Sequence, residues 1–356
     1  MFGMLLIYNG TRVNIMSITR NQRNQLIGAD QEPVFSAKVT SFNSSTNYSV
    51  PSKTTSVTYL VVAGGGGGGR IGGGGGAGGF RSSVPGAASG GGASAEPALT
   101  VTAGSTVPVV VGGGGPGSTS GNGDWRPGND SSFGPIASVK GGSGGNRFAY
   151  TTPSGTAGGS QLAQDGGSGG GAGIWYSVGN YPDGDASGRG TANQGFPGGG
   201  ARSPTHNYGC AVGGGGASEA GQKGNPDNVI GGRGGAGVAS SITGSPVVYA
   251  DGGGGASGDT GLSVPNDKGG APGPGGSGGT GYGSGDHPAL HATDAAANRG
   301  GGGGGSGYGP ATPSFAVVGA GGSGFVAVND PFGDFAASSV WNLRRVFELK
   351  KEGDWI

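Results

Sequence analysis

The residues best suited to metal chemistry lie close together in the last quarter of the chain. His287 and His291 are four positions apart, and Asp286 and Asp294 flank them. Imidazole nitrogens and carboxylate oxygens are common metal ligands, so this group could in principle hold a cation. Pro288 lies between the two histidines, however, and the chain has only three histidines in total. We favour a set of surface polar residues, and we expect no metal site and no cofactor.

Motifs for catalysis are absent or carry no information. The pattern Gly-x-Gly-x-x-Gly recurs simply because 94 of the 356 residues are glycine. The sequence contains no Gly-Lys-Ser/Thr of a P-loop, no His-Glu-x-x-His and no pair of cysteines. Strings resembling Gly-x-Ser-x-Gly lack a strand-to-helix elbow and a partner histidine. The single cysteine, Cys210, is expected to be a small buried residue. We therefore predict that the protein is not an enzyme.

Large aromatic and polar side chains gather between the glycine tracts, where loops are expected. Such residues are typical of binding surfaces, because Tyr and Trp supply contact area at a low cost in conformational entropy. We predict a receptor-binding surface formed by Trp125, Arg126, Phe148, Tyr150, Trp175, Tyr176, Tyr181, His206 and Tyr208. The alternative, equally weighted, is that these rings cap the ends of the core and are buried.

Short strands must position these loops. Runs rich in β-branched and aromatic residues, bounded by Ser, Asn and Pro, have the signature of strands. They lie at residues 34–40, 47–51, 56–63, 98–111, 133–139, 245–250, 315–318 and 325–328. Almost every run abuts a glycine tract. The predicted fold class is therefore mostly β and irregular, with no large side-chain core.

The glycine tracts are expected to form the rest of the core. The strand-like run 59–63 leads directly into the tract 64–69, and a second tract follows at 72–79. We predict a bundle of left-handed extended polyglycine II helices with three residues per turn, whose N–H and C=O groups bond to neighbouring helices. Glycine allows this because it has no side chain to keep two backbones apart. A valine at an inward glycine such as Gly66 or Gly74 should then block the approach of a neighbouring helix.

The overall composition favours an ordered protein. Hydrophobic residues make up 32% and charged residues 11%, and the formal net charge is +0, whereas disordered chains usually combine low hydrophobicity with high net charge. A neutral balance gives no electrostatic reason to expect nucleic acid or an anionic membrane as a partner. The apolar start of the chain is too short for a membrane anchor and has no basic segment before it. We expect synthesis in the cytoplasm without export and no membrane insertion.

Both ends of the chain differ from the glycine-rich body at 36–330. Residues 1–35 contain no glycine tract and are predicted to be an attachment segment, although simple packing on the body is an equal alternative. The C-terminal segment 331–356 is predicted to contain an α-helix, because Ser338 or Ser339 can cap its start and Gly353 suits its end. Candidate assembly residues in this segment are Val340, Trp341, Leu343, Val346, Phe347 and Trp355.

An ordered set of phrases resembles the glycine-rich tail and tail-fibre proteins of bacteriophages. The phrases are FNSSTNYSVPSKTTSVTYLVVAGGGGGG, GGGGGAGGFRSS, LTVTAGSTVPVVVGGGG, SSFGPIASVKGG, VVYADGGGGA, GGGGGGSGYG and GAGGSGFVAV, and they span about residues 40 to 330. The terminal SSVWNLRRVFELKKEGDWI is similar to the C-terminal helix of phage structural proteins.

This resemblance implies a virion protein made in the host cytoplasm. In similar adhesins of T-even-like phages, glycine tracts form a polyglycine II sandwich whose loops bind the host receptor. Here the loops are longer and less regular, and a terminal helix is added, so receptor contacts do not carry over. The implied partners are other virion proteins at the termini, a host cell-surface protein or glycan, and further copies of the chain. The alternative is a purely structural virion protein that decorates a capsid or builds a fibre.

Overall fold

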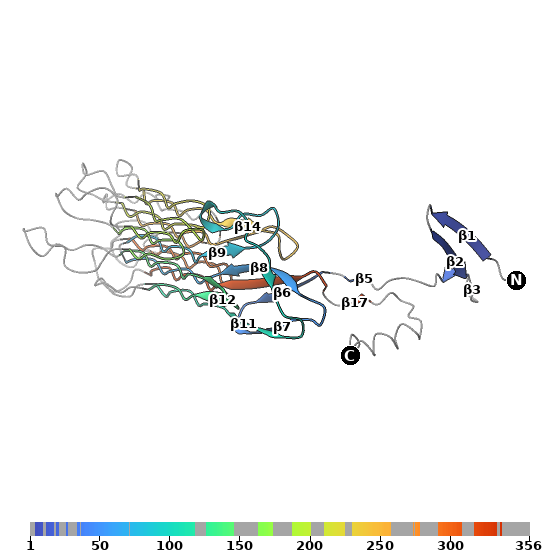
Figure 1. The fold of residues 1–356 in the computed structure, drawn as a ribbon. Coiled ribbons are helices and arrows are strands. Elements are labelled where there is room, and N and C mark those ends of the chain that lie inside the picture. Colours follow the sequence, from blue (N-terminus) through green and yellow to red (C-terminus); the bar gives the residue numbers. More distant parts are fainter. Residues whose placement is uncertain are drawn as a thin grey trace, which may run out of the picture. The chain divides into compact units, whose positions relative to one another are not determined.

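A computed structural model describes most of the glycine-rich body and several strands outside it. The described residues are 37–70, 72–117, 126–145, 163–173, 187–200, 210–224, 230–257, 273, 275–277, 291–307 and 317–332, together with the backbone of strands at 4–9, 12–17, 19–20, 26–27, 34–35 and 335–336. The chain divides into two compact units, one formed by Met1–Lys38 with Pro331–Ile356 and the other by Val39–Asp330. Figure 1 shows the strands and the glycine tracts of the larger unit.

The smaller unit consists of paired short strands. Strand β1 (Met4–Asn9) pairs antiparallel with β2 (Arg12–Ser17), and β3 (Thr19–Arg20) pairs with β4 (Leu26–Ile27). Strand β5 (Val34–Phe35) pairs with β17 (Phe335–Ala336), so segments from both ends of the sequence share one small sheet. The predicted C-terminal helix lies outside the described residues.

The larger unit contains small antiparallel sheets at one end. Its strands are β6 (Lys38–Phe42), β7 (Thr46–Ser49), β8 (Ser56–Val62), β9 (Phe80–Ser82), β10 (Leu99–Thr100), β11 (Thr106–Val110), β12 (Ser131–Phe133), β13 (Ile136–Ser138), β14 (Val238–Ser240), β15 (Val247–Tyr249) and β16 (Phe325–Asp330), with a short 3₁₀ helix at Gly90–Gly92. One sheet has the order β10-β8-β16-β6, with β9 also paired to β8. A second has the order β13-β12-β11-β7, and β14 pairs with β15.

The pair β8–β16 has a hydrophobic cluster on each face. Because side chains alternate along a strand, Leu60 and Val62 of β8 face one cluster, with Phe80 and Tyr249. Tyr59 and Val61 face the other cluster, which also contains Tyr48 and Phe133. All of these side chains are buried. The sheet end therefore has a conventional side-chain core around its central strand pair.

Beyond the sheets, the glycine tracts form extended rods that bond to one another with a period of three. In rod 64–69, the N–H groups of Gly64 and Gly67 donate to one rod, at Asn129 and Arg126. The N–H groups of Gly65 and Gly68 donate to a second rod, at Gly322 and Gly319, and those of Gly66 and Gly69 to a third, at Gly76 and Gly73. A partner that recurs every third residue is the geometry of a helix with three residues per turn. The predicted combination of short strands and polyglycine II helices is confirmed.

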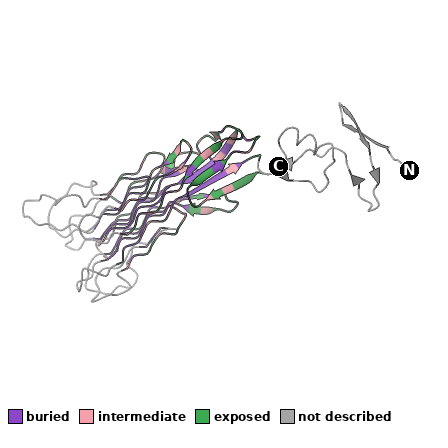
Figure 2. Cartoon of the chain, turned by 90° about the horizontal axis from the view of Figure 1, so that it is seen from below, coloured by how far each residue is buried: buried purple, intermediate pink, exposed green. Residues whose placement is uncertain are grey.

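Rod 72–79 is enclosed by other rods and is buried along its whole length. It donates to rods 139–145, 212–215 and 300–306. It accepts from rods 64–69, 168–171 and 253–256. The N–H groups of this rod all donate to backbone carbonyls, and most of its C=O groups accept from backbone N–H groups, which meets the requirement for burying a polar chain. Figure 2 shows buried rods, in purple, and strands in which buried, intermediate and exposed residues are mixed.

The inward glycines have no room for a side chain. A Cβ atom added to Gly66 would overlap the carbonyl oxygen of Gly142, and one added to Gly74 would overlap that of Gly253. Both positions are closer than the 3.0 Å that real Cβ atoms respect. The Cα–H bond of each glycine is thus directed at a carbonyl oxygen of the next rod, a weak stabilising contact.

Some predicted strands differ from those in the structure. The run 133–139 is not one strand, because Gly134, with φ +53, lies in the turn between β12 and β13. The run 98–111 is likewise two strands, β10 and β11. The strand predicted at 315–318 is wrong where the structure describes it, because Val317 and Val318 begin a rod in which Gly319 and Gly321 bond to neighbouring tracts. Two adjacent β-branched residues beside a glycine tract therefore do not indicate a strand at this position.

Candidate binding end of the bundle

The larger unit has two different ends. The chain enters it through β6 and leaves it through β16, and these two strands are neighbours in one sheet. Both connections to the terminal segments are therefore made at the sheet end. The turns at this end, such as those between β12 and β13 and between β14 and β15, are described throughout.

The opposite end of the bundle, the distal end, is where the intervals between described residues begin and end. Hydrogen bonds tie the flanking residues together there. Gly73 donates to Gly145 (3.0 Å) and Gly145 to Gly171 (2.8 Å), next to the intervals that start after 145 and 173. Ala211 donates to Ala256 (3.0 Å), and Ala292 donates to Val317 (2.9 Å). The described residues beside these intervals thus form a common, backbone-bonded base.

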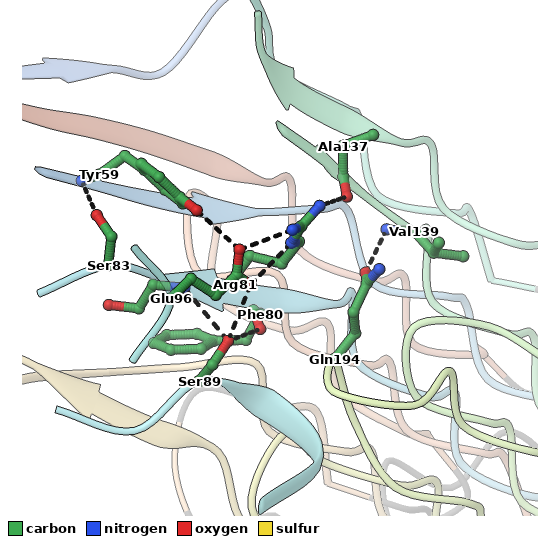
Figure 3. A network of polar contacts seen from close by, with 10 residues as sticks. Tyr59, Phe80, Arg81, Ser83, Ser89, Glu96, Ala137, Val139 and Gln194 are labelled. Carbon is green, nitrogen blue, oxygen red and sulfur yellow. Dashed lines mark hydrogen bonds and ion pairs between the residues drawn. The ribbon is translucent and has the colours of Figure 1, made fainter. Parts of the chain in front are cut away.

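A polar network at the sheet end ties β8 and β9, the strands next to the first two rods, to the segment that carries Glu96 (Figure 3). Arg81 of β9 donates to both carboxylate oxygens of Glu96, at 2.8 and 2.6 Å, and Tyr59 of β8 donates to Glu96 at 2.7 Å. Burial by itself would raise the pKa of Glu96, but the hydrogen bonds from Arg81 and Tyr59 and the charge of Arg81 outweigh it and lower the pKa. Burial and the bond to Glu96 raise the pKa of Tyr59. The network is a structural tie.

A second tie lies where the chain leaves the unit. Thr54 donates to the buried carboxylate of Asp330, at 2.7 and 2.8 Å to its two oxygens, and Tyr48 lies 3.4 Å from Asp330 Oδ2. Burial first, and then the charge of Asp330, raise the pKa of Tyr48. This contact anchors the end of β16.

One buried carboxylate is only partly satisfied. Asp251 follows β15 and starts a rod, and its Oδ1 accepts the N–H of Gly237 at 3.0 Å. Its Oδ2 is buried and has no hydrogen-bond partner. Burial raises the pKa of Asp251 to about 6, although the bond from Gly237 acts in the opposite direction. A single carboxylate, one oxygen of which already accepts a hydrogen bond, supplies too few ligands for a metal ion.

The structure describes only one of the predicted receptor-binding residues. Arg126 is half-buried at the distal end, and its carbonyl accepts the N–H of Gly67. The remaining candidates lie outside the described residues: Trp125, Phe148, Tyr150, Trp175, Tyr176, Tyr181, His206 and Tyr208. The same holds for the candidate assembly residues Val340, Trp341, Leu343, Val346, Phe347 and Trp355.

Two residues considered as metal ligands have another role. His291 Nδ1 accepts the N–H of Val317 at 3.1 Å, and Asp294 Oδ1 accepts the N–H of Ala320 at 2.7 Å. These two hydrogen bonds join neighbouring rods at the distal end. His287 and Asp286 lie outside the described residues. Within the part of the chain that the structure describes, no three His, Cys, Asp or Glu side chains are grouped to hold a metal ion.

Comparison with known families identifies the rod-bearing unit. The sequence profile of a glycine-rich domain matches residues 40–329. The chain belongs to this glycine-rich domain family. A search of curated proteins gives no match. The matched residues cover both sheets and rods of the larger unit, so the glycine-rich domain is the bundle together with its sheet end.

Sequence reasoning missed the side chains that hold the glycine-rich domain together. Arg81 and Glu96 are 15 positions apart and have no motif, and the buried Asp251 looks like an ordinary turn residue beside glycines.

Among the described residues, no helix has the length and apolar character needed to cross a membrane.

Proposed function

We propose that the chain is a virion binding protein, a phage tail-fibre or tail-tip adhesin that presents loops to a host-surface receptor from a rigid polyglycine bundle. One observation supports this proposal most strongly. The chain enters and leaves the glycine-rich domain at the sheet end, through β6 and β16, whereas the described residues that flank the intervals lie at the distal end. A domain whose connections to the rest of the chain lie at one end leaves its other end accessible to a ligand.

The rigidity of the base also supports a binding role. Loops bind with less loss of entropy when their ends are fixed, and the flanking residues at the distal end are bonded to one another through the backbone. The sequence between the rods contains Trp125, Trp175 and most of the tyrosines, which suits a receptor-binding surface. The ordered phrases that resemble phage tail proteins supply the proposed setting.

A purely structural virion role is the second candidate. It is favoured by the pairing of β5 with β17, which brings both terminal segments into one unit suited to assembly contacts. In that case the terminal unit is the functional part and the glycine-rich domain is a spacer or a decoration.

A binding experiment separates the two roles. Purified full-length chain is labelled and its binding to bacterial cells from a host panel, and to their isolated surface polysaccharides, is measured. We expect saturable binding to some cells, and a loss of at least about tenfold in affinity when Trp125, Trp175 and Tyr208 are replaced by alanine, because aromatic side chains dominate binding energies.

The matched control is Val248→Ala, which truncates an exposed side chain on β15 at the sheet end. It should bind like the wild type. Equal binding by the triple variant and the control would count against the adhesin role. Immunogold labelling on phage particles then tests the structural role, which predicts incorporation that depends on residues 1–35 and 331–356.

A further inference from the structure

The surface rods of the glycine-rich domain have one face that no other described rod covers. In rod 112–117, Gly112 and Gly115 face the rod at 126–130, and Gly114 and Gly117 face the rod at 317–322. The third column, Gly113 and Pro116, is exposed. Rod 196–200 repeats this arrangement, with Gly198 and Gly199 buried and Pro197 and Gly200 exposed. A three-sided rod at the surface therefore always has an outward column.

An outward column of backbone could accept a further rod. Inside the bundle, rods associate mainly through backbone N–H and C=O groups and close backbone approach. A glycine-rich rod from a second copy of the chain meets the same requirements. The situation is analogous to the open edge strand of a β-sheet, which pairs with other chains unless the protein blocks it.

At several surface positions the outward N–H group is either missing or capped. Proline has no N–H to donate, and prolines occupy the outward positions 116 and 197. Elsewhere an exposed aspartate accepts the outward N–H. Asp130 Oδ1 accepts from Lys140 (2.8 Å), Asp165 Oδ1 from Arg189 (2.6 Å) and Asp294 Oδ1 from Ala320 (2.7 Å). All three aspartates are exposed, and none of them lies on the buried rods 64–69 and 72–79.

We propose that the flank of the bundle is a latent docking surface for a polyglycine rod of a second copy of this chain, and that the aspartate caps and outward prolines keep it closed. The inference is independent of what the distal end binds. Under this proposal, two copies can still associate through their terminal units. The caps and prolines prevent only side-by-side association of two bundles.

The test compares two triple variants of the full-length chain. Asp130, Asp165 and Asp294 are replaced by alanine in one variant and by asparagine in the other. Asparagine keeps the acceptor oxygen and loses only the charge, whereas alanine uncovers the N–H groups. Sedimentation velocity over a range of concentrations should show self-association at least about tenfold tighter than wild type for the alanine variant. The asparagine variant should sediment like the wild type.

Equal self-association of both triple variants would overturn the proposal, because loss of negative charge would then explain it. Sedimentation of the alanine variant like the wild type, with only a lower melting temperature, would also overturn it, since the aspartates would merely join neighbouring rods. A Pro116→Gly, Pro197→Gly variant tests the second device without removing any contact between rods. It should self-associate more than a Pro116→Ser, Pro197→Ser control, whose side chains still obstruct the outward columns.

Discussion

The rods and the sheets of the glycine-rich domain are both buried, but for opposite reasons. At the sheet end, Phe133, Tyr59 and Leu60 exclude water with large side chains, as in an ordinary protein core. Along rod 72–79 the buried groups are peptide units that bond to rods on every side. The sheet end therefore depends on side chains being large, and the rods depend on side chains being absent. The two regions should respond in opposite ways to substitution.

Adding volume to an enclosed rod should have the largest effect. In Gly74→Val the new Cβ would overlap the carbonyl of Gly253, which is backbone and cannot rotate away. We expect a loss of at least about 4 kcal/mol in the free energy of unfolding, in the range that usually unfolds a domain. Circular dichroism and thermal melting of the purified chain measure it. A melting temperature within a few degrees of wild type would mean that the rods are spacers.

Removing volume from the sheet end should have a smaller, graded effect. Phe133 is fully buried, and its ring lies 5.8 Å from that of Tyr48 in an edge-to-face arrangement. Phe133→Ala should lower the free energy of unfolding by about 3 to 4 kcal/mol, from lost burial and a cavity. Phe133→Leu is the control and should recover most of this loss in a denaturant titration. Equal loss in both variants would indicate that the ring geometry matters more than the volume.

These differences explain what the sequence could and could not predict. Tract length and composition predict rods, because only glycine allows backbones to approach so closely. The neighbours of each rod were unpredictable, because Gly66 and Gly75 carry no side chain that distinguishes one partner from another. Side-chain ties between rods, such as Asp294 with the N–H of Ala320, likewise have no local signal in the sequence. The hairpin at Gly134 and the rod start at Val317 were missed because strand propensity ignores these tertiary contacts.

The boundary between the regions should show an unusual dependence on pH. The pKa of Asp251 is about 6 in the folded chain and 3.8 in its unperturbed state, because the carboxylate is buried. Folding therefore favours the protonated form, and this contribution to stability is present in full below pH 3.8 and is lost as the pH rises through about 6. The loss should be about 3 kcal/mol, from a pKa difference of roughly two units at about 1.4 kcal/mol per unit.

Asp251→Asn removes the titration and isolates this effect. The difference in unfolding free energy between the variant and the wild type should grow in favour of the variant from pH 5 to pH 7.5, measured by urea titration with the two proteins side by side. Other carboxylates, such as Glu96 with its lowered pKa, affect both proteins equally. A difference that does not change with pH would show that Asp251 is ionised throughout and has a partner in solution.

The smallest predicted effect tests the rod geometry most closely, because three adjacent glycines should respond differently to one methyl group. A Cβ at Gly112 would overlap the carbonyl of Asn129, and one at Gly114 would overlap that of Gly321. At the exposed Gly113 it would meet only the side-chain nitrogen of Asn129, at 3.6 Å. Alanine at 112 or 114 should therefore destabilise the domain, whereas Gly113→Ala should change the unfolding free energy by less than about 0.5 kcal/mol. It could even stabilise the chain slightly, since alanine restricts the unfolded state more than glycine does. Thermal melting of the three variants tests the period of three residues directly. A similar loss of stability at all three positions would contradict a rod with one outward column.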